Sequence, residues 1–254
     1  IILKIKEVRF TQNYLPMTNP KQLFLDVKID KSKTLDSFIK CDSTELIIQA
    51  LKEFCKEDSL NQFFYLWGKE GSGKNYLLHS LNQEFISMDK RAAFIPFKKH
   101  KFSSPSILEG LNSVDLIILE NIEMYPNDPE WELAFFNLIN ECKQSGSKII
   151  CSSKKVAKDL EFSLPDLISR VLSFSAFELK EVEEGEKKEA LKKALTRKGL
   201  TAEDKVISYI LNHTSRGLSD LLQLISDLDN FSLEKKRKIT IPLIKEMISF
   251  NNAI

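Results

Sequence analysis

The stretch Gly68-Lys69-Glu70-Gly71-Ser72-Gly73-Lys74-Asn75 decides the fold, because it matches the phosphate-binding pattern G-x-x-x-x-G-K-[ST] up to its last position. Its glycines let backbone N–H groups close around phosphate oxygens, and Lys74 reaches the terminal phosphates. The closing Ser or Thr of the pattern places a hydroxyl on Mg²⁺, whereas Asn75 offers a weaker and differently placed amide oxygen. The loop predicts nucleotide binding and puts hydrolysis in doubt. The expected contacts are Gly68, Gly71, Ser72, Gly73, Lys74, Asn75 and Tyr76.

The segments on either side of this loop predict the strand and the helix that the motif requires. Residues 63–67 form a short apolar run typical of a buried strand, and the leucines and Phe85 within 77–85 have helical spacing. Asp128 followed by Pro129 predicts the start of a later helix. Strand and helix candidates alternate, which predicts a parallel α/β sheet. The other strand candidates are 92–96, 116–119, 148–151 and 174–179, and further helices are expected from 43 and over 164–171.

The pattern after Glu181 is helical throughout and predicts a small helical domain behind the α/β domain. Its helix candidates are 186–198, 202–212, 217–230 and 241–250. The expected division of the chain is an N-terminal segment 1–36, a nucleotide-binding α/β domain 37–180 and a helical domain 181–254. The chain starts at Ile1 without a methionine, so we expect the functional chain to start at Met17 and residues 1–16 to be non-native.

Composition limits the functional classes. The net charge of +1 gives no global basic field for nucleic acid. The four cysteines show no C-x-x-C pairing and are typical of reduced thiols in a cytoplasmic protein. No apolar run reaches the roughly 18 residues of a membrane span, and no secretory signal is visible. Residues 97–102 interleave basic and aromatic side chains, so they suit either nucleic-acid contact or a solvated loop with its aromatic rings tucked in.

Two further strand ends carry polar side chains that suit a nucleotide site. The apolar strand 116–119 ends in Glu120-Asn121, where an acidic element normally holds Mg²⁺ through water and polarises the attacking water. Glu120 is one methylene too long, and Asn121 cannot accept a proton as a carboxylate can. These residues either form a degraded acidic element, with Mg²⁺ held near Asn75 and Glu120, or simply cap the strand. Ser152 and Ser153 offer hydroxyls where a γ-phosphate would lie, or form a serine-rich turn.

In this order the motifs resemble the AAA+ module of the bacterial replication initiator DnaA, and more closely its Hda-type regulatory relatives. The resemblance covers the chain from about Gln22 to its end. The segments that carry it are Tyr65-Leu66-Trp67-Gly68, Leu77-Leu78-His79, Glu120-Asn121-Ile122-Glu123, Leu164-Pro165-Asp166-Leu167-Ile168-Ser169-Arg170 and Lys238-Ile239-Thr240-Ile241-Pro242. It implies an AAA+ P-loop fold, a parallel sheet flanked by helices, with a small C-terminal all-helical lid domain.

The resemblance also implies roles for residues outside the loop. Arg170 matches the family's arginine finger, which acts in trans on a neighbouring protein's ATP, whereas the residues alone suggest an ion pair with Asp166. Arg216 matches the sensor 2 arginine at the start of a lid helix, or is a plain surface charge. Gln22, Leu23 and Leu25 match the family's short sliding-clamp-binding motif. Without the family, Leu23, Leu25 and Val27 form the alternating pattern of an ordinary edge strand.

From this resemblance we expect a negative regulator of replication initiation. Its partners would be DnaA and the DNA polymerase sliding clamp, its cofactor ADP or ATP, with Mg²⁺ left open. It would stimulate DnaA's ATP hydrolysis and have little or no turnover itself. The chain has no length for the initiator's DNA-binding domain, so no sequence-specific DNA binding is expected. The sequence leaves open whether the chain forms a homodimer. The alternative functions are an autonomous P-loop ATPase and a nucleotide-independent adaptor.

Overall fold

The computed structural model describes residues 33–38, 42–97, 104–125, 127–213 and 218–251. Within these residues, five parallel strands form one sheet in the order β2-β3-β4-β1-β5. The strands are β1 (Phe63–Trp67), β2 (Ala92–Pro96), β3 (Leu116–Glu120), β4 (Lys148–Ser153) and β5 (Ser175–Glu178). An α-helix lies in the connections from β1 to β2, from β3 to β4 and from β4 to β5, so the predicted parallel α/β class is confirmed.

The sheet is buried on both faces, and its strands send alternate side chains into two separate cores. On β1, Phe64 and Leu66 join one core while Tyr65 joins the other. On β3, Ile118 and Ile117 divide in the same way. This alternation follows from the two-residue period of a strand, and burial on both faces explains the continuously apolar run of β3.

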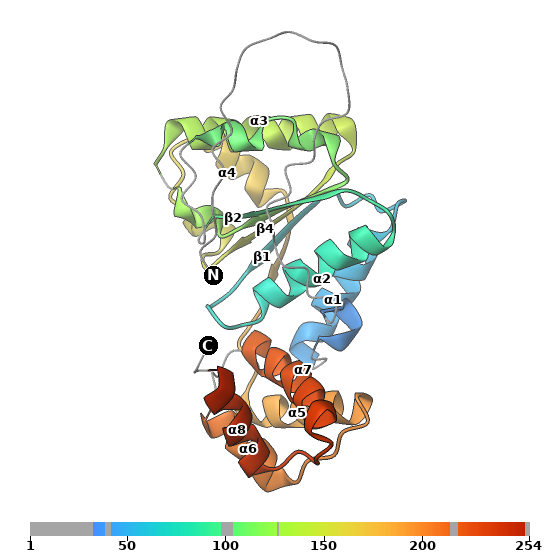
Figure 1. Ribbon diagram of the computed structural model, residues 1–254. Coiled ribbons are helices and arrows are strands. Elements are labelled where there is room, and N and C mark those ends of the chain that lie inside the picture. Colours follow the sequence, from blue (N-terminus) through green and yellow to red (C-terminus); the bar gives the residue numbers. More distant parts are fainter. Residues whose placement is uncertain (1–32, 39–41, 98–103, 126, 214–217, 252–254) are drawn as a thin grey trace.

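Helices cover both faces of the sheet, as Figure 1 shows. Helices α1 (Asp42–Cys55) and α2 (Lys74–Ser87) cover one face, and α3 (Pro129–Ser145) and α4 (Pro165–Leu172) cover the other. Asp128 caps α3 as predicted, accepting hydrogen bonds from the backbone N–H groups of Glu130 (3.2 Å) and Trp131 (3.3 Å). Gly146 ends this helix in the left-handed conformation.

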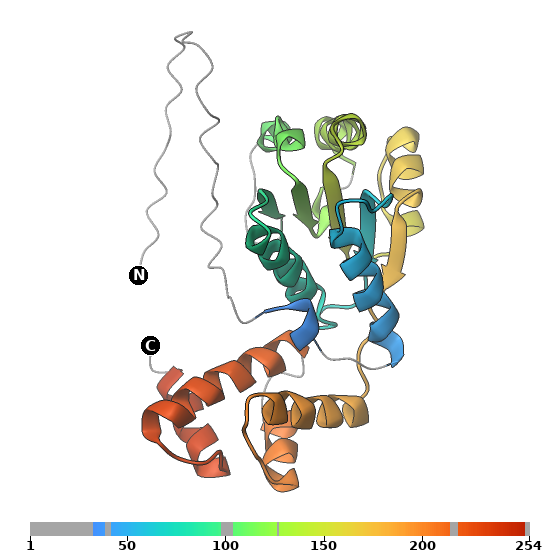
Figure 2. The same ribbon diagram turned by 90° about the vertical axis from the view of Figure 1, so that its right-hand side faces the viewer.

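Four further helices form the C-terminal domain below the sheet (Figure 2). They are α5 (Glu184–Arg197), α6 (Asp204–His213), α7 (Leu218–Lys235) and α8 (Ile241–Asn251). Most of their apolar side chains form a third core, while Ala190 of α5 packs into the core beneath α1 and α2. Helix α5 therefore joins the two domains, and the predicted helical lid is confirmed. Among the described residues, no helix is long and apolar enough to cross a membrane.

The buried carboxylate of Glu132 fixes the chain where it enters α4. Glu132 is 1% exposed, and its two oxygens accept hydrogen bonds from the backbone N–H groups of Ser163 (3.0 Å) and Leu164 (2.6 Å). Leu164 is the N-cap of α4 and makes no side-chain cap hydrogen bond. The carboxylate of Glu132 therefore holds the two residues that lead into α4, and it ties this helix to α3.

We predict that Glu132→Ala lowers the free energy of unfolding by about 2–4 kcal/mol, because it leaves buried backbone N–H groups without an acceptor. Urea unfolding followed by circular dichroism measures this change. Glu130→Ala is the matched control, since Glu130 is exposed on the same helix, and its loss should change stability by less than about 0.5 kcal/mol. Equal effects of the two substitutions would contradict the role given to Glu132.

Candidate functional site

The glycine-rich loop leaves β1 at a point where the backbone is enclosed by its neighbours. The N–H group of Gly68 donates to the carbonyl of Ser153 on β4 (3.2 Å), and the N–H group of Leu179 donates to the carbonyl of Trp67 (2.7 Å). Gly68 has φ +153°, and a Cβ atom there would lie 2.3 Å from the carbonyl oxygen of Leu179. Only glycine fits at this position, so the first residue of the motif is fixed by packing as well as by phosphate geometry.

The other two glycines of the loop turn the chain into α2. Gly71 has φ +81° and Gly73 has φ +107°, both in the left-handed region that favours glycine. Gly73 is the N-cap of α2 and makes no side-chain cap hydrogen bond, so the helix begins at the loop with the uncovered N-terminus that suits an anion. The strand, loop and helix thus have the arrangement that the sequence motif predicts for a phosphate site.

Lys74 lies inside the loop. Its side chain is 6% exposed, and its ammonium donates to the carbonyls of Gly68 and Lys69, the latter at 2.8 Å. Burial lowers the pKa of this ammonium, and the carboxylate of Glu123 is the strongest of the charges that oppose the shift. The lysine is therefore held at the centre of the loop by neutral acceptors, where it can bind a phosphate.

The buried polar atoms of the described residues identify this region as a site. Three buried side-chain oxygens lack a hydrogen-bond partner there: Ser72 Oγ, Glu120 Oε2 and Glu123 Oε2. Ser72 belongs to the loop, and Glu120 and Glu123 flank the end of β3. A buried polar atom without a partner is unfavourable, and here all three lie around one loop. This concentration indicates that the region is built to hold a polar ligand.

The predicted strand-end residues lie where the neighbouring strands meet the loop. Ser152 and Ser153 are fully buried at the end of β4. Ser152 Oγ accepts a hydrogen bond from the N–H group of Asn121 (3.2 Å), and Ser153 Oγ accepts one from that of Lys155 (3.0 Å). The structure thus brings Glu120, Asn121 and the two serines together at the carboxyl edge of the sheet beside the loop. Their chemical roles stay predictions.

The donor set suits Mg²⁺ only together with phosphate oxygens. Among the described residues, no three or more His, Cys, Asp and Glu side chains are grouped to hold a metal ion. The buried Glu120 oxygen without a partner is a fitting ligand, because Mg²⁺ in nucleotide sites uses one or two carboxylates plus phosphates. Asn75, by contrast, is exposed on the first turn of α2.

Arg170 lies apart from the loop. It is on α4, on the opposite face of the sheet from α2 (Figure 1). Its guanidinium lies 5.8 Å from the ring centroid of Phe136 on α3. None of the described carboxylates forms an ion pair with Arg170, so the pair with Asp166 suggested by their spacing is not formed. A half-buried cation held over an aromatic face remains able to bind an anionic partner.

Several predicted functional residues lie outside the described residues. These are Arg216, Gln22, Leu23, Leu25 and residues 98–102 of the basic and aromatic loop. Phe97, the first residue of that loop, is described and buried, with its ring against Trp131 and Phe135. It is therefore a core residue, as the alternative interpretation of the loop requires.

Sequence reasoning missed Glu123 as a member of the site. The signal was present in the segment Glu120-Asn121-Ile122-Glu123, but a carboxylate three residues after a strand end has no fixed direction without the turn between them. It also missed the ion pair between Glu70 on the loop and Lys154 after β4, whose charged atoms are 2.6 Å apart. This pair links the rim of the loop to the end of the neighbouring strand.

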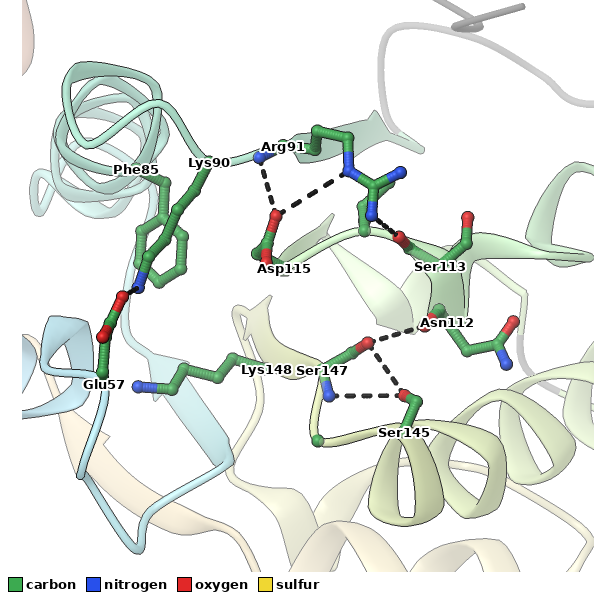
Figure 3. A pocket seen from close by; sticks show the side chains of 12 residues that line it. Glu57, Phe85, Lys90, Arg91, Asn112, Ser113, Asp115, Ser145, Ser147 and Lys148 are labelled. Carbon is green, nitrogen blue, oxygen red and sulfur yellow. Dashed lines mark hydrogen bonds and ion pairs between the residues drawn. The ribbon is translucent and has the colours of Figure 1, made fainter. Parts of the chain in front are cut away.

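A cavity of about 280 Å³ lies at the edge of the sheet opposite the loop, where the strands begin (Figure 3). Its charged side chains are paired with one another or with the backbone. Lys90 pairs with Glu57 at 2.9 Å, and Asp115 accepts from the backbone N–H of Arg91 at 2.8 Å. The ammonium of Lys148 donates to carbonyls at the end of α1 and just beyond it. These contacts tie the strand starts together and leave the cavity without an unpaired charge among the described residues.

Comparisons with known proteins agree with this geometry. The model of the bacterial DnaA ATPase domain matches residues 29–174, and that of the Hda lid domain matches residues 184–248. An uncharacterized protein of Haemophilus influenzae is 30% identical over 230 residues, which cover 90% of this chain and 99% of that protein.

Solved structures share the fold. A replication initiator DnaA bound to AMPPCP and single-stranded DNA has 22% identity and a TM-score of 0.64, covering 82% of this chain and 69% of its own. Domain III of DnaA from Thermotoga maritima has 17% identity and a TM-score of 0.66, covering 87% and 97%. A RuvB mutant from the same organism has 19% identity and a TM-score of 0.59, covering 86% and 72%. The fold is therefore that of AAA+ proteins.

We predict that Gly68→Ala disrupts the loop. The added Cβ atom meets the backbone of Leu179 and Ser72 Oγ, so the loop or the start of the lid linker has to shift. The substitution should lower stability by about 1–3 kcal/mol through this steric strain and weaken any nucleotide binding at least tenfold. Urea unfolding and calorimetric titration with ADP measure the two effects.

Gly185→Ala is the control for this prediction, because a Cβ atom at Gly185 meets nothing within 4 Å. It should leave binding unchanged, and it should leave stability unchanged or raise it by up to about 1 kcal/mol, because Gly185 lies in α5 and alanine is the better helix former. A Gly68→Ala variant with unchanged stability would show that the close approach between the loop and Leu179 is unimportant.

Proposed function

The chain belongs to the family of the bacterial DnaA ATPase domain, with an Hda-type lid, and we propose that it is a nucleotide-bound regulator of replication initiation. In this proposal the loop holds ADP, which fixes the angle between the α/β domain and the lid. The chemistry takes place in the ATP site of DnaA, to which Arg170 is presented in trans. Hydrolysis there leaves the initiator in its ADP form and stops further initiation.

The observation that carries this proposal is the position of Arg170. It lies on the far face of the sheet from α2, and no carboxylate of the described residues neutralises it. The sheet separates a cation on that face from the helix that follows its own loop, whereas a second protein can reach it. An arginine supplied in trans neutralises the charge that develops on the transferring phosphoryl group.

The loop and the end of β3 also support a chain that binds nucleotide while hydrolysis takes place in the ATP site of DnaA. Asn75 stands where the motif has a hydroxyl, and Asn121 stands where a carboxylate would polarise water. Both changes weaken turnover in this chain without altering Arg170. Nucleotide binding is supported by the start of α2 at the glycine loop, by the buried Lys74 and by the oxygens without partners around it.

We predict that Arg170→Ala abolishes stimulation of DnaA. Labelled ATP bound to the initiator is mixed with DNA-loaded clamp and this protein, and hydrolysis is followed in time. Wild-type chain should accelerate hydrolysis by about 10³-fold or more, the scale of fingers supplied in trans, and Arg170→Ala should not. Arg170→Lys should lose most of the effect, because a lysine lacks the planar fork of donors.

Arg237→Ala is the matched control, since Arg237 is an exposed arginine of the lid that pairs with Glu246 at 2.9 Å. It should stimulate as the wild type does. The arginine-finger role of Arg170 would be contradicted if the wild-type chain does not accelerate ATP hydrolysis by DnaA, or if the Arg170→Ala chain is fully active. ATP turnover by the chain alone that Lys74→Ala abolishes would instead identify an autonomous ATPase. Failure to bind either nucleotide would identify an adaptor.

The second contact in the proposal is with the sliding clamp, through Gln22, Leu23 and Leu25. An extended peptide of this kind inserts its leucines in an apolar pocket while the glutamine bonds at the rim. We predict that replacing these three residues by alanine weakens clamp binding at least tenfold in surface plasmon resonance. Val27→Ala is the control, because an ordinary edge strand would need Val27 as much as Leu25, whereas the motif does not include it.

A further inference from the structure

Glu123 reaches the nucleotide site through a sharp turn after β3. Asn121 has φ +61° and ψ +57°, and the short 3-10 turn Ile122–Met124 follows it. Ile122 is buried in the core and anchors the turn. The turn carries Glu123 to the end of β4, where its Oε1 accepts a hydrogen bond from the N–H group of Lys154 (3.1 Å). Glu123 therefore adjoins the Ser152-Ser153 pair.

The second oxygen of Glu123 points into the buried region without a partner. Its Oε2 is inaccessible and makes no hydrogen bond, like the Oε2 atom of Glu120. Of the carboxylates that act on Lys74, Glu123 acts most strongly, ahead of Glu70 and Glu120. Among the described residues, the charges that act on Lys74 are those of these three carboxylates and the ammonium of Lys154. With Lys74 included, these groups carry a net negative charge.

This distribution of charge bears on which nucleotide the loop holds. A lysine in this motif lies beside the β- and γ-phosphates, so a carboxylate close to it also lies close to the place of a third phosphate. Two negative groups brought together in a region of low dielectric repel each other strongly. Mg²⁺ would relieve this repulsion, but the loop ends in Asn75 and lacks the hydroxyl that normally binds the ion.

We propose that Glu123 is a specificity-determining residue, whose carboxylate makes the loop prefer a nucleoside diphosphate over a triphosphate. The residue excludes the third phosphate by charge and holds the end of β4 by its bond to Lys154. This inference rests on the nucleotide binding proposed above. It differs from a purely structural role for Glu123, in which the hydrogen bond to Lys154 is all that matters.

The substitution Glu123→Gln separates the two roles, because glutamine keeps an oxygen for the N–H group of Lys154 and removes the charge. The full-length chain is titrated calorimetrically with ADP and with AMPPCP in buffer containing Mg²⁺. Wild type should bind ADP more tightly. Glu123→Gln should lower the ratio of the AMPPCP dissociation constant to the ADP dissociation constant by about fivefold or more. The change should come chiefly from tighter binding of AMPPCP.

Glu161→Gln is the matched control. It also removes a carboxylate that pairs with a lysine just after β4, Lys155, but Glu161 is exposed outside the loop and is not among the charges that act on Lys74. The ratio should stay within about twofold of wild type in this variant. Thermal melting of each variant shows that it is folded.

A measurement on the unsubstituted chain provides a second test, which does not depend on how a variant folds. Withholding Mg²⁺ should widen the wild-type preference for ADP, because the ion is what would relieve the repulsion between the carboxylate and a third phosphate. The preference should widen less in Glu123→Gln. If wild type binds both nucleotides and Glu123→Gln leaves the ratio unchanged, the role of Glu123 is overturned while nucleotide binding stands. If wild type binds neither nucleotide, both proposals fail.

Discussion

The contact on which the rest of the molecule depends is the close approach of the backbone at the end of β1 to the strands on either side. Gly68 donates to Ser153 of β4, and the carbonyl of Leu179, just after β5, occupies the space that a Cβ atom on Gly68 would need. Leu179 in turn begins the connection to the lid. The phosphate loop, the serine pair and the lid linker are therefore joined through one point of backbone packing. A ligand that shifts the loop by a fraction of an ångström acts directly on the linker.

The loop region also contains buried polar atoms without partners. Ser72 Oγ in the loop, Glu120 at the end of β3 and Glu123 in the turn after it each have a buried oxygen without a hydrogen-bond partner. Buried groups of this kind lower stability unless a ligand satisfies them. The fold therefore gives up stability at the loop for binding. It is stabilised elsewhere by the apolar cores on the two faces of the sheet, and by buried hydrogen bonds such as those that Glu132 accepts from the backbone before α4.

The sequence predicts the sheet well, because its strands are short, apolar and bounded by glycine, proline or polar residues. The strands 63–67 and 92–96 have the predicted limits, and the cap at Asp128 is confirmed. Contacts between segments far apart in the chain were not predictable from local pattern. Glu123 enters the site only because Asn121 adopts a left-handed conformation, and Arg170 faces Phe136 instead of Asp166 only because α3 and α4 pack together. Sequence spacing identifies which elements form, whereas tertiary packing decides which side chains meet.

Lys74 and Arg170 are held in different ways, and this difference bears on how one chain can bind nucleotide and also act on a partner. Lys74 is buried among backbone carbonyls, so its charge is committed to its own loop. Arg170 rests on an aromatic ring, which stabilises a cation without neutralising it, whereas an ion pair with Asp166 would have to break before a partner's phosphate could bind. In the proposed function, a loop without the metal-binding hydroxyl is combined with an arginine that acts on a neighbour. The two features can vary independently, because Lys74 belongs to the loop before α2 and Arg170 to α4, on opposite faces of one sheet.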